Sequence, residues 1–180
     1  FANGEGAGRP LPPLNLVGDM GGGGMLLVNG VLAALLEAAS SGQGQVIDVA
    51  MVDGAAQLMW MFHSMAAIGA WNVEARESNL LDGGAHFYNT YECADGEYVS
   101  LGSIEPQFYA LLMQLAELPE EQFGEQNDAR RWPEQKEQLA RIMRSKTRDE
   151  WCALLEGTDV CFAPVLRLTE APEHAAAKAR

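Results

Sequence analysis

The sequence predicts an α/β chain in which a partial Rossmann-like β-α-β-α large domain is followed by a smaller α+β domain with a β-hairpin and helices. Short apolar runs alternate with helical apolar patterns up to residue 71, which favours a β-α-β-α unit. A polar passage follows, and after it apolar and polar residues alternate on both sides of a tight turn, which indicates a hairpin. We therefore expect four segments: residues 1–71 in the large domain, 72–84 as a linker, 85–166 as the small domain, and 167–180 returning towards the large domain.

The elements of the large domain follow from its apolar pattern. A buried strand is expected at residues 14–18 and a helix at 23–39. A turn of glycine and polar residues then leads to a second strand at 45–50 and a second helix at 51–70. The apolar stretch 25–39 is interrupted by polar residues and is too short to span a membrane, so we expect a buried helix there and no membrane partner.

The small domain is expected to begin with the hairpin, whose strands at 87–92 and 97–103 flank the turn Ala94-Asp95-Gly96. Three helical patterns and a short final strand follow it, at residues 106–118, 133–145, 148–156 and 160–166.

Asp19 is the first candidate functional residue. It ends the first apolar run and stands just before four consecutive glycines that lead into a helical pattern. A strand that delivers an acid to a glycine turn at a helix N-terminus places it beside unpaired N–H donors, which can hold an anion or a developing oxyanion. An N-cap followed by an ordinary loop is the alternative interpretation. Two phosphate-binding patterns are disfavoured. No Lys-Ser or Lys-Thr pair follows the glycines, and a glycine run meets the spacing Gly-x-Gly-x-x-Gly only trivially.

Glu105 is the second candidate. Pro106 suits the first position of a helix, which puts Glu105 at the N-cap. Glutamate is a poor N-cap residue, so its carboxylate is expected to serve another purpose, with a plain surface helix start as the alternative.

Composition limits the partners that the chain can bind. Its 180 residues carry a net charge of −13, which disfavours nucleic acid or an anionic membrane because phosphate binding needs Lys and Arg. The three cysteines show no metal-binding spacing, so no metal is expected. We expect the three cysteines to be free thiols and the protein to lie in a reducing compartment, which is the cytoplasm if the source is bacterial.

Four sequence blocks together carry a resemblance to a known family. They read Pro-Leu-Asn-Leu-Val-Gly-Asp-Met-Gly-Gly-Gly-Gly-Met, Gly-Gln-Gly-Gln-Val-Ile-Asp-Val-Ala-Met-Val-Asp-Gly, Leu-Leu-Asp-Gly-Gly-Ala-His-Phe-Tyr-Asn-Thr-Tyr and Gly-Ser-Ile-Glu-Pro-Gln-Phe-Tyr. In this order they resemble the family III CoA-transferase superfamily, and the last block resembles its α-methylacyl-CoA racemase branch. The resemblance runs from about Arg9 to the end of the chain.

The resemblance implies racemisation of 2-methylacyl-CoA thioesters by α-proton abstraction and reprotonation. It makes Asp19 one catalytic acid/base group and Glu105 the acid that pairs with a catalytic histidine, with backbone amides near Asp19 or Met20 stabilising the enolate. Substrate-binding positions are implied for Asn15, Tyr88, Met20 and Gly21. No cofactor is implied, because CoA is part of the substrate, and the implied assembly is an interlocked homodimer.

The histidine motif of such racemases has no counterpart here, and none of His63, His86 and His174 lies in a matching sequence. We therefore expect the chain to lack an N-terminal, CoA-binding part that holds the histidine. The scarcity of cations agrees with this expectation, since residues 1–80 contain only Arg9 and Arg76.

Two alternatives to a racemase stay open. In a CoA transferase of the same superfamily, Asp19 would attack the thioester as a nucleophile. The chain could also be an inactive fragment that acts only as an assembly module.

Overall fold

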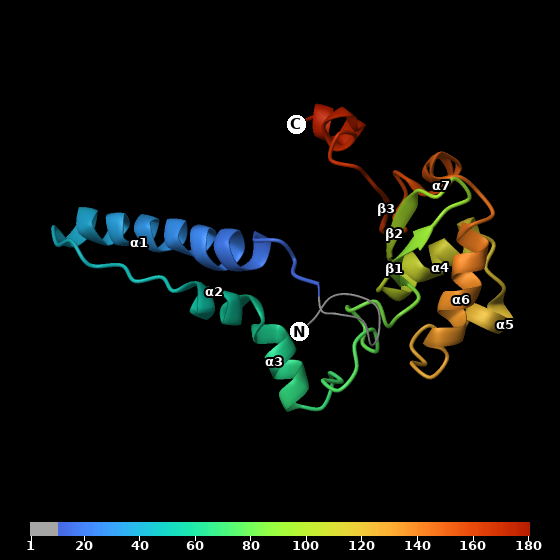
Figure 1. Ribbon diagram of the computed structural model, residues 1–180, viewed down its shortest axis with the longest axis horizontal. Helices are drawn as coiled ribbons and strands as arrows, with labels where there is room; N and C mark the ends of the chain where they lie inside the picture. Colours follow the sequence, from blue (N-terminus) through green and yellow to red (C-terminus); the bar gives the residue numbers. More distant parts are fainter. Residues whose placement is uncertain (1–10) are drawn as a thin grey trace. The chain divides into compact units, whose positions relative to one another are not determined.

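The computed structural model describes residues 11–180, so the first ten residues of the predicted large domain lie outside the described part. The chain divides between Arg76 and Glu77 into two compact units, which are described separately (Figure 1).

The first unit is helical. A π-helix, η1 (Leu16–Met25), continues directly into the long helix α1 (Leu26–Ser41), which ends at Gly42 in a left-handed conformation. Residues 42–50 run back beside α1, and a Cβ on Gly30 would lie 3.0 Å from Ile47 Cγ2 (Figure 1). Two short helices follow, α2 (Met51–Leu58) and α3 (Trp60–Ala67).

The two strands expected in this unit are not formed. Residues 14–18 enter η1 instead of a buried strand, and the side chain of Leu16 is exposed. Residues 45–50 have no strand assignment. A strand exists only through hydrogen bonds to a neighbouring strand, and no described residue offers such pairing to either segment. The Rossmann-like β-α-β-α unit is therefore not seen among the described residues.

Close backbone packing explains why glycine stands at Gly22 and Gly54. The backbone of η1 crosses that of α2 at these two residues, which are both buried. A Cβ on Gly54 would lie only 1.9 Å from the carbonyl oxygen of Gly22, and a Cβ on Gly22 would lie 2.7 Å from Ala55 N. Part of the glycine run thus serves the packing of η1 on α2.

The expectation of a buried helix at 25–39 is wrong, because no residue of α1 is buried. The described residues cover only the side of α1 that faces 42–50, and Leu27, Leu32 and Leu36 are exposed. The continuous helical segment Leu16–Ser41, 26 residues long, has the length and hydropathy of a membrane span. Core helices of soluble proteins and signal sequences meet the same criterion.

The second unit contains a three-stranded antiparallel sheet in the order β1 (Tyr88–Glu92), β2 (Tyr98–Gly102), β3 (Phe162–Val165). The predicted hairpin is confirmed, with Tyr88 paired to Gly102 across β1 and β2.

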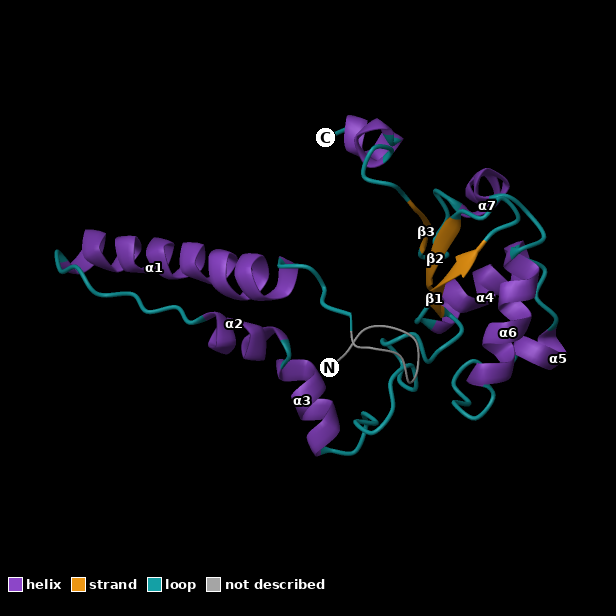
Figure 2. Cartoon of the chain, viewed as in Figure 1, coloured by secondary structure: helices purple, strands orange, loops and turns teal. Residues whose placement is uncertain are grey.

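Helices lie against one face of this sheet (Figure 2). The three predicted helices are confirmed as α4 (Pro106–Leu115), α6 (Trp132–Met143) and α7 (Arg148–Leu155). Three short elements were not predicted: α5 (Glu120–Phe123), the 3-10 helix η2 (Ala171–Glu173) and α8 (Ala175–Lys178). The predicted strand at 160–166 is confirmed in shorter form as β3.

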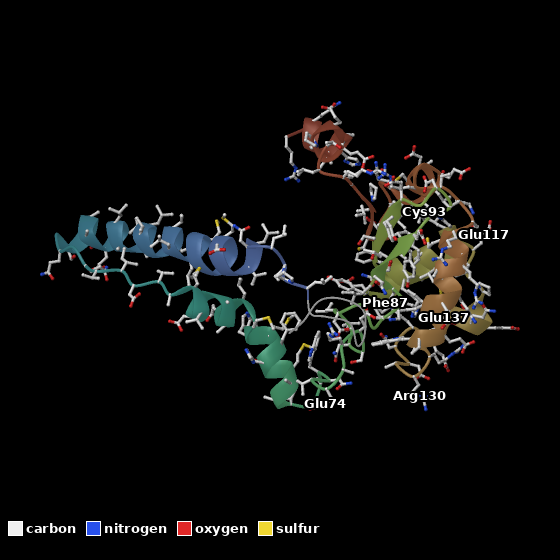
Figure 3. The ribbon with its side chains drawn as sticks, viewed as in Figure 1. Glu74, Phe87, Cys93, Glu117, Arg130 and Glu137 are labelled. Atoms are coloured by element: carbon white, nitrogen blue, oxygen red, sulfur yellow. The ribbon has the colours of Figure 1, made fainter. Side chains whose placement is uncertain are left out.

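The buried hydrophobic core of the described residues lies in this second unit, between positions 85 and 160. Phe87, labelled in Figure 3, stands just before β1 and is fully buried. Its ring meets those of Tyr109 and Trp132 edge-on at 5.7 and 5.9 Å. Such aromatic pairs contribute beyond their buried area, so Phe87 fixes α4 and α6 against the start of the sheet.

Candidate active site

Four of the predicted site residues lie on the first turns of η1. Asn15 is its N-cap and makes no side-chain capping bond, while Asp19 and Met20 are exposed and Gly21 is half-buried. Asn15 and Asp19 are four residues apart, which places them on one side of a helix. Extended π-helices are rare, and π-turns occur frequently at functional sites.

Of the two backbone amides that the resemblance implies for an enolate, that of Met20 is engaged. It donates a hydrogen bond to the carbonyl oxygen of Asn15 at 3.2 Å. The role of the Asp19 amide stays a prediction. The sequence interpretation assumed a strand and a glycine turn at this point, whereas the glycines lie inside a helix whose backbone amides bond internally.

Glu105 lies in the second unit, as the N-cap of α4 with Pro106 at the first helical position, as predicted. Its side chain makes no capping hydrogen bond and is exposed. Its backbone is held, since its carbonyl oxygen accepts from the amides of Phe108 and Tyr109, both at 3.0 Å. The main chain at Glu105 is therefore fixed, while the carboxylate of Glu105 does not cap α4.

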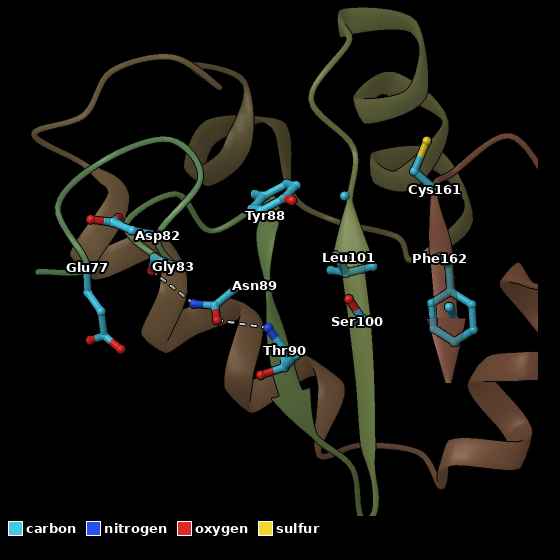
Figure 4. A pocket seen from close by; sticks show the side chains of 12 residues that line it. Glu77, Asp82, Gly83, Tyr88, Asn89, Thr90, Ser100, Leu101, Cys161 and Phe162 are labelled. Carbon is cyan, nitrogen blue, oxygen red and sulfur yellow. Dashed lines mark hydrogen bonds between the residues drawn. The ribbon is translucent and has the colours of Figure 1, made fainter. Parts of the chain in front are cut away.

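Tyr88 lines an open pocket of about 530 Å³ on the outer face of the sheet (Figure 4). The floor between the strands is formed by small side chains, Thr90, Ser100 and Ala163, which stand in one row across β1, β2 and β3. Tyr88 stands at the end of the pocket where Cys161 also lies (Figure 4).

The charges of this pocket indicate what it can accept. Its lining contains two acids, Glu77 and Asp82, and no Lys or Arg. The carboxylate of Asp82 accepts from the amides of Asn79 and Gly84 at 2.8 and 3.1 Å, so it serves the loop at the rim. A pocket without cations suits an uncharged group better than a phosphate.

Cys161 lines the pocket and lies near enough to Glu105 to feel its charge. The residue is exposed, and partial desolvation first, and then the charges of Glu105 and Asp159, raise the pKa of its thiol. Its backbone is in the left-handed region with a φ of 57°, and its carbonyl oxygen accepts from Gly102 N at 2.9 Å. Glu105 and Tyr88 thus belong to the same end of the sheet, whereas Asp19 belongs to the first unit.

The histidines of the chain are engaged elsewhere or isolated. His86 is fully buried and bonds Tyr109 through Nε2. His174 accepts from the amide of Ala176 and pairs with Glu156, while His63 is exposed on α3. The part of the chain that the structure describes also holds no cluster of ligands for a metal ion.

Sequence reasoning missed the groups that support Glu105, above all Ser103 and Gln126. Both are buried, and Gln126 lies in a loop after α5 with no sequence motif around it. Ser103 stands in the fourth sequence block beside Glu105, but nothing in the sequence indicates the hydrogen bonds that either residue makes.

Each unit thus presents one exposed carboxylate that caps no helix, Asp19 on η1 and Glu105 before α4, and carboxylates of this kind are suited to acid–base or nucleophilic chemistry. The sequence pattern of CoA-transferase family III matches residues 1–180, and the chain belongs to this family.

Curated relatives are known from several animals. The chain is 46% identical to the alpha-methylacyl-CoA racemase of Mus musculus and 42% identical to that of Homo sapiens, over 92% of this chain and 43% of each relative. It is 30% identical to a CaiB/baiF CoA-transferase family protein of Caenorhabditis elegans, over 93% of this chain and 48% of the relative. The chain therefore spans less than half the length of these relatives.

Solved structures share the fold. The orthorhombic crystal form of Rv3272 from Mycobacterium tuberculosis matches with a TM-score of 0.71 at 21% identity, over 96% of this chain and 45% of that one. The D175A mutant of Rv3272 matches with a TM-score of 0.72 at 24% identity, over 96% of this chain and 44% of that one. These likenesses support the mixed fold of helices and a small antiparallel sheet.

Proposed function

We propose that this chain is part of an enzyme of its relatives' length that racemises 2-methylacyl-CoA thioesters. The observation that carries the proposal is the identity of 46% and 42% to two proteins named alpha-methylacyl-CoA racemase, over 92% of the chain. The exposed carboxylates of Asp19 and Glu105 support it, since neither is engaged in capping its helix.

The reaction begins with removal of the proton on the carbon next to the thioester carbonyl, and it ends with return of a proton to the opposite face. One base is needed on each face. Asp19 serves one face, and a histidine outside these 180 residues serves the other. Glu105 pairs with that histidine and orients its ring, as an acid that holds a catalytic imidazole does in other enzymes.

Substrate contacts come from Asn15, Met20, Gly21 and Tyr88. Because the Met20 amide is bonded to Asn15, Met20 contributes its exposed side chain and not its N–H. The pocket beside Tyr88 has no cation in its lining, so it receives the acyl group, and the CoA phosphates are bound elsewhere. No cofactor takes part, and the working assembly is a homodimer.

The family itself favours a second candidate, a CoA transferase. In that reaction the Asp19 carboxylate attacks the thioester carbonyl, a mixed anhydride forms, and the CoA thiolate leaves. An exposed Asp19 permits this attack as readily as proton transfer.

One experiment separates the two enzymes. The protein of relatives' length is incubated with one enantiomer of a 2-methylacyl-CoA in D2O, with and without a free carboxylic acid. A racemase exchanges the α-hydrogen for deuterium and inverts the centre without the acid, whereas a transferase moves CoA only when the acid is present. Asp19→Asn is expected to abolish activity, while Glu37→Gln, an exposed acid on α1, is the matched control that retains it.

The 180 residues alone are expected to racemise negligibly. Loss of one acid/base group costs roughly 10²–10⁴-fold, and here the contacts to CoA are also incomplete. Robust turnover by the 180-residue chain would refute the assignment of one of the two catalytic bases to a residue outside it. If the longer protein catalyses neither reaction, the remaining alternative is a chain that acts only as an assembly module.

A further inference from the structure

We propose that Gln126 is the positioning residue of Glu105. Its side-chain amide clamps the two peptide carbonyls that lead into this acid and so fixes where the carboxylate points. The inference rests on the role of Glu105 in the proposed racemase.

The clamp consists of two hydrogen bonds from one nitrogen. Gln126 Nε2 donates to the carbonyl oxygen of Ser103 at 3.0 Å and to that of Ile104 at 2.9 Å. These are the two residues before Glu105, and Gln126 lies 22 and 23 residues further along the chain. Gln126 is 8% exposed, so water does not replace these bonds readily.

A primary amide is well matched to this task. Its NH2 group carries two hydrogens at one atom, one for each carbonyl. A carboxylate of the same shape has only acceptors, and a hydrocarbon would leave both carbonyls without a partner. Because a buried carbonyl without a hydrogen-bond partner is unfavourable, the turn would rearrange to find other donors.

The remaining backbone around Glu105 is fixed by other groups. The amide of Ser103 donates to Phe87 O at 3.0 Å, and its hydroxyl donates to Val160 O at 2.5 Å. The carbonyl oxygen of Glu105 itself accepts hydrogen bonds from two amides in the first turn of α4. The hydrogen bonds that the structure shows to the carbonyls of Ser103 and Ile104 come from Gln126. Removing the Gln126 amide therefore affects the turn that carries Glu105 first.

The core in turn holds Gln126 in place. Trp132 Nε1 donates to the carbonyl oxygen of Gln126 at 2.8 Å, and the Trp132 ring meets Phe87 edge-on. The loop that carries Gln126 is thereby anchored to the residue that precedes β1. This gives the amide a rigid base, which a positioning group needs.

Loss of the clamp should affect the chemical step more than binding. Gln126 does not line the pocket beside Tyr88, so substrate contacts there are unchanged. A shift of Glu105 by a fraction of an ångström to 1 Å misorients the imidazole that it holds, and misplacements of that size cost up to roughly 100-fold.

The test uses the protein of relatives' length with Gln126→Leu and the milder Gln126→Met. The matched control is Gln135→Leu, because Gln135 is also buried, at 1% exposed, and donates to the carbonyl oxygen of Gln122 at 2.9 Å, away from Glu105. All three variants are expected to lower Tm. Only the Gln126 variants should lower kcat, by roughly 10- to 100-fold with KM within about twofold. They should also shift the acidic limb of the pH profile in the same direction as Glu105→Gln measured alongside them.

Equal losses of kcat in the Gln126 and Gln135 variants, or full kcat in a folded Gln126 variant, would overturn the proposal. Crystal structures of wild type and Gln126→Met provide a second readout that does not depend on turnover. If wild type does not racemise, the proposed function fails, while displacement of Glu105 in the variant still supports the clamp and an unmoved Glu105 refutes it.

Discussion

His86 Nε2 lies 2.7 Å from the hydroxyl oxygen of Tyr109, and that hydroxyl lies 2.7 Å from the carbonyl oxygen of Phe123. A carbonyl only accepts, so the single hydroxyl hydrogen of Tyr109 goes to Phe123. His86 must then donate from Nε2, which leaves Nδ1 deprotonated and buried without a hydrogen-bond partner in the described structure. The core therefore holds His86 as a neutral imidazole with its proton on Nε2.

The stability of the second unit should depend on pH through His86. Burial lowers the pKa of His86 to about 4, from 6.5. Between these values the unfolded chain binds more protons than the folded one, so stability rises with pH and is complete above about 6.5. The shift corresponds to about 3 kcal/mol, lost progressively as the pH falls towards 4.

Urea unfolding at several pH values, compared between wild type and His86→Phe, measures this contribution. The variant should lack the part of the slope between pH 6.5 and 4 that belongs to His86. Parallel curves for the two proteins would show that His86 does not titrate as its burial implies.

Removal of the Tyr109 hydroxyl should destabilise the same unit. Tyr109→Phe leaves the N–H of His86 and the carbonyl of Phe123 without partners in the core. Each such group costs about 1–3 kcal/mol. Tyr98→Phe is the matched control, since Tyr98 is exposed and should change the free energy of unfolding by less than about 0.5 kcal/mol. Denaturant midpoints that are equal for the two variants would contradict the hydrogen-bond chain.

The contact of Gly22 with Gly54 predicts a steep effect of one methyl group. Gly54→Ala would place its Cβ 1.9 Å from Gly22 O, a backbone atom that cannot turn aside, so α2 must separate from η1. At Gly18 a Cβ would meet nothing within 4 Å, and Ala is the better helix former by roughly 0.5–1 kcal/mol. Hydrogen exchange of α2 should therefore accelerate strongly in Gly54→Ala and remain as in wild type, or slow down, in Gly18→Ala. Unchanged exchange in Gly54→Ala would refute this packing.

Local signals explain which parts of the fold were predictable. The hairpin has a tight turn between alternating strands, and Glu105-Pro106 marks the start of α4, so both were found from neighbouring residues. The segments 14–18 and 45–50 look like strands by composition, but a strand needs partners, and no described residue provides them. The clamp of Gln126 on Ser103 joins residues that only the fold brings together, so no sequence pattern could reveal it.

Arg148 should tether the C-terminal segment to the sheet. Its side chain is 12% exposed, and two guanidinium nitrogens donate to the carboxylate of Glu170, at 2.8 and 3.1 Å. The Arg148 hydrogen bonds and the amide of Arg167 lower the pKa of Glu170 to about 2, from 4.5. The stability that the Arg148–Glu170 pair contributes is therefore present above pH 4.5. It is lost as the pH falls towards 2, because the Glu170 carboxylate then takes up a proton.

Arg148→Met should consequently free residues 166–174 while the core persists. Hydrogen exchange at pH 7 is expected to rise in that segment and to change little in β1 and β2. Arg130→Met is the control, because the Arg130 side chain is 90% exposed and pairs with Asp128, two residues away. Protection of 166–174 that is the same in both variants would exclude the tether.

The two-base mechanism predicts opposite isotope patterns for the two candidate acids. Each enantiomer of a 2-methylacyl-CoA presents its α-proton to one base only. With Glu105→Gln the histidine is misoriented, so the enantiomer deprotonated by Asp19 should still exchange its α-hydrogen in D2O without inversion, and the other should not. Asp19→Asn should reverse the pattern, with a loss of roughly 10²–10⁴-fold in exchange of the enantiomer that Asp19 serves. Mass spectrometry of each recovered enantiomer gives the result. If both variants lose exchange in both enantiomers alike, Asp19 and Glu105 do not serve separate faces, and nucleophilic attack by Asp19 becomes the better account.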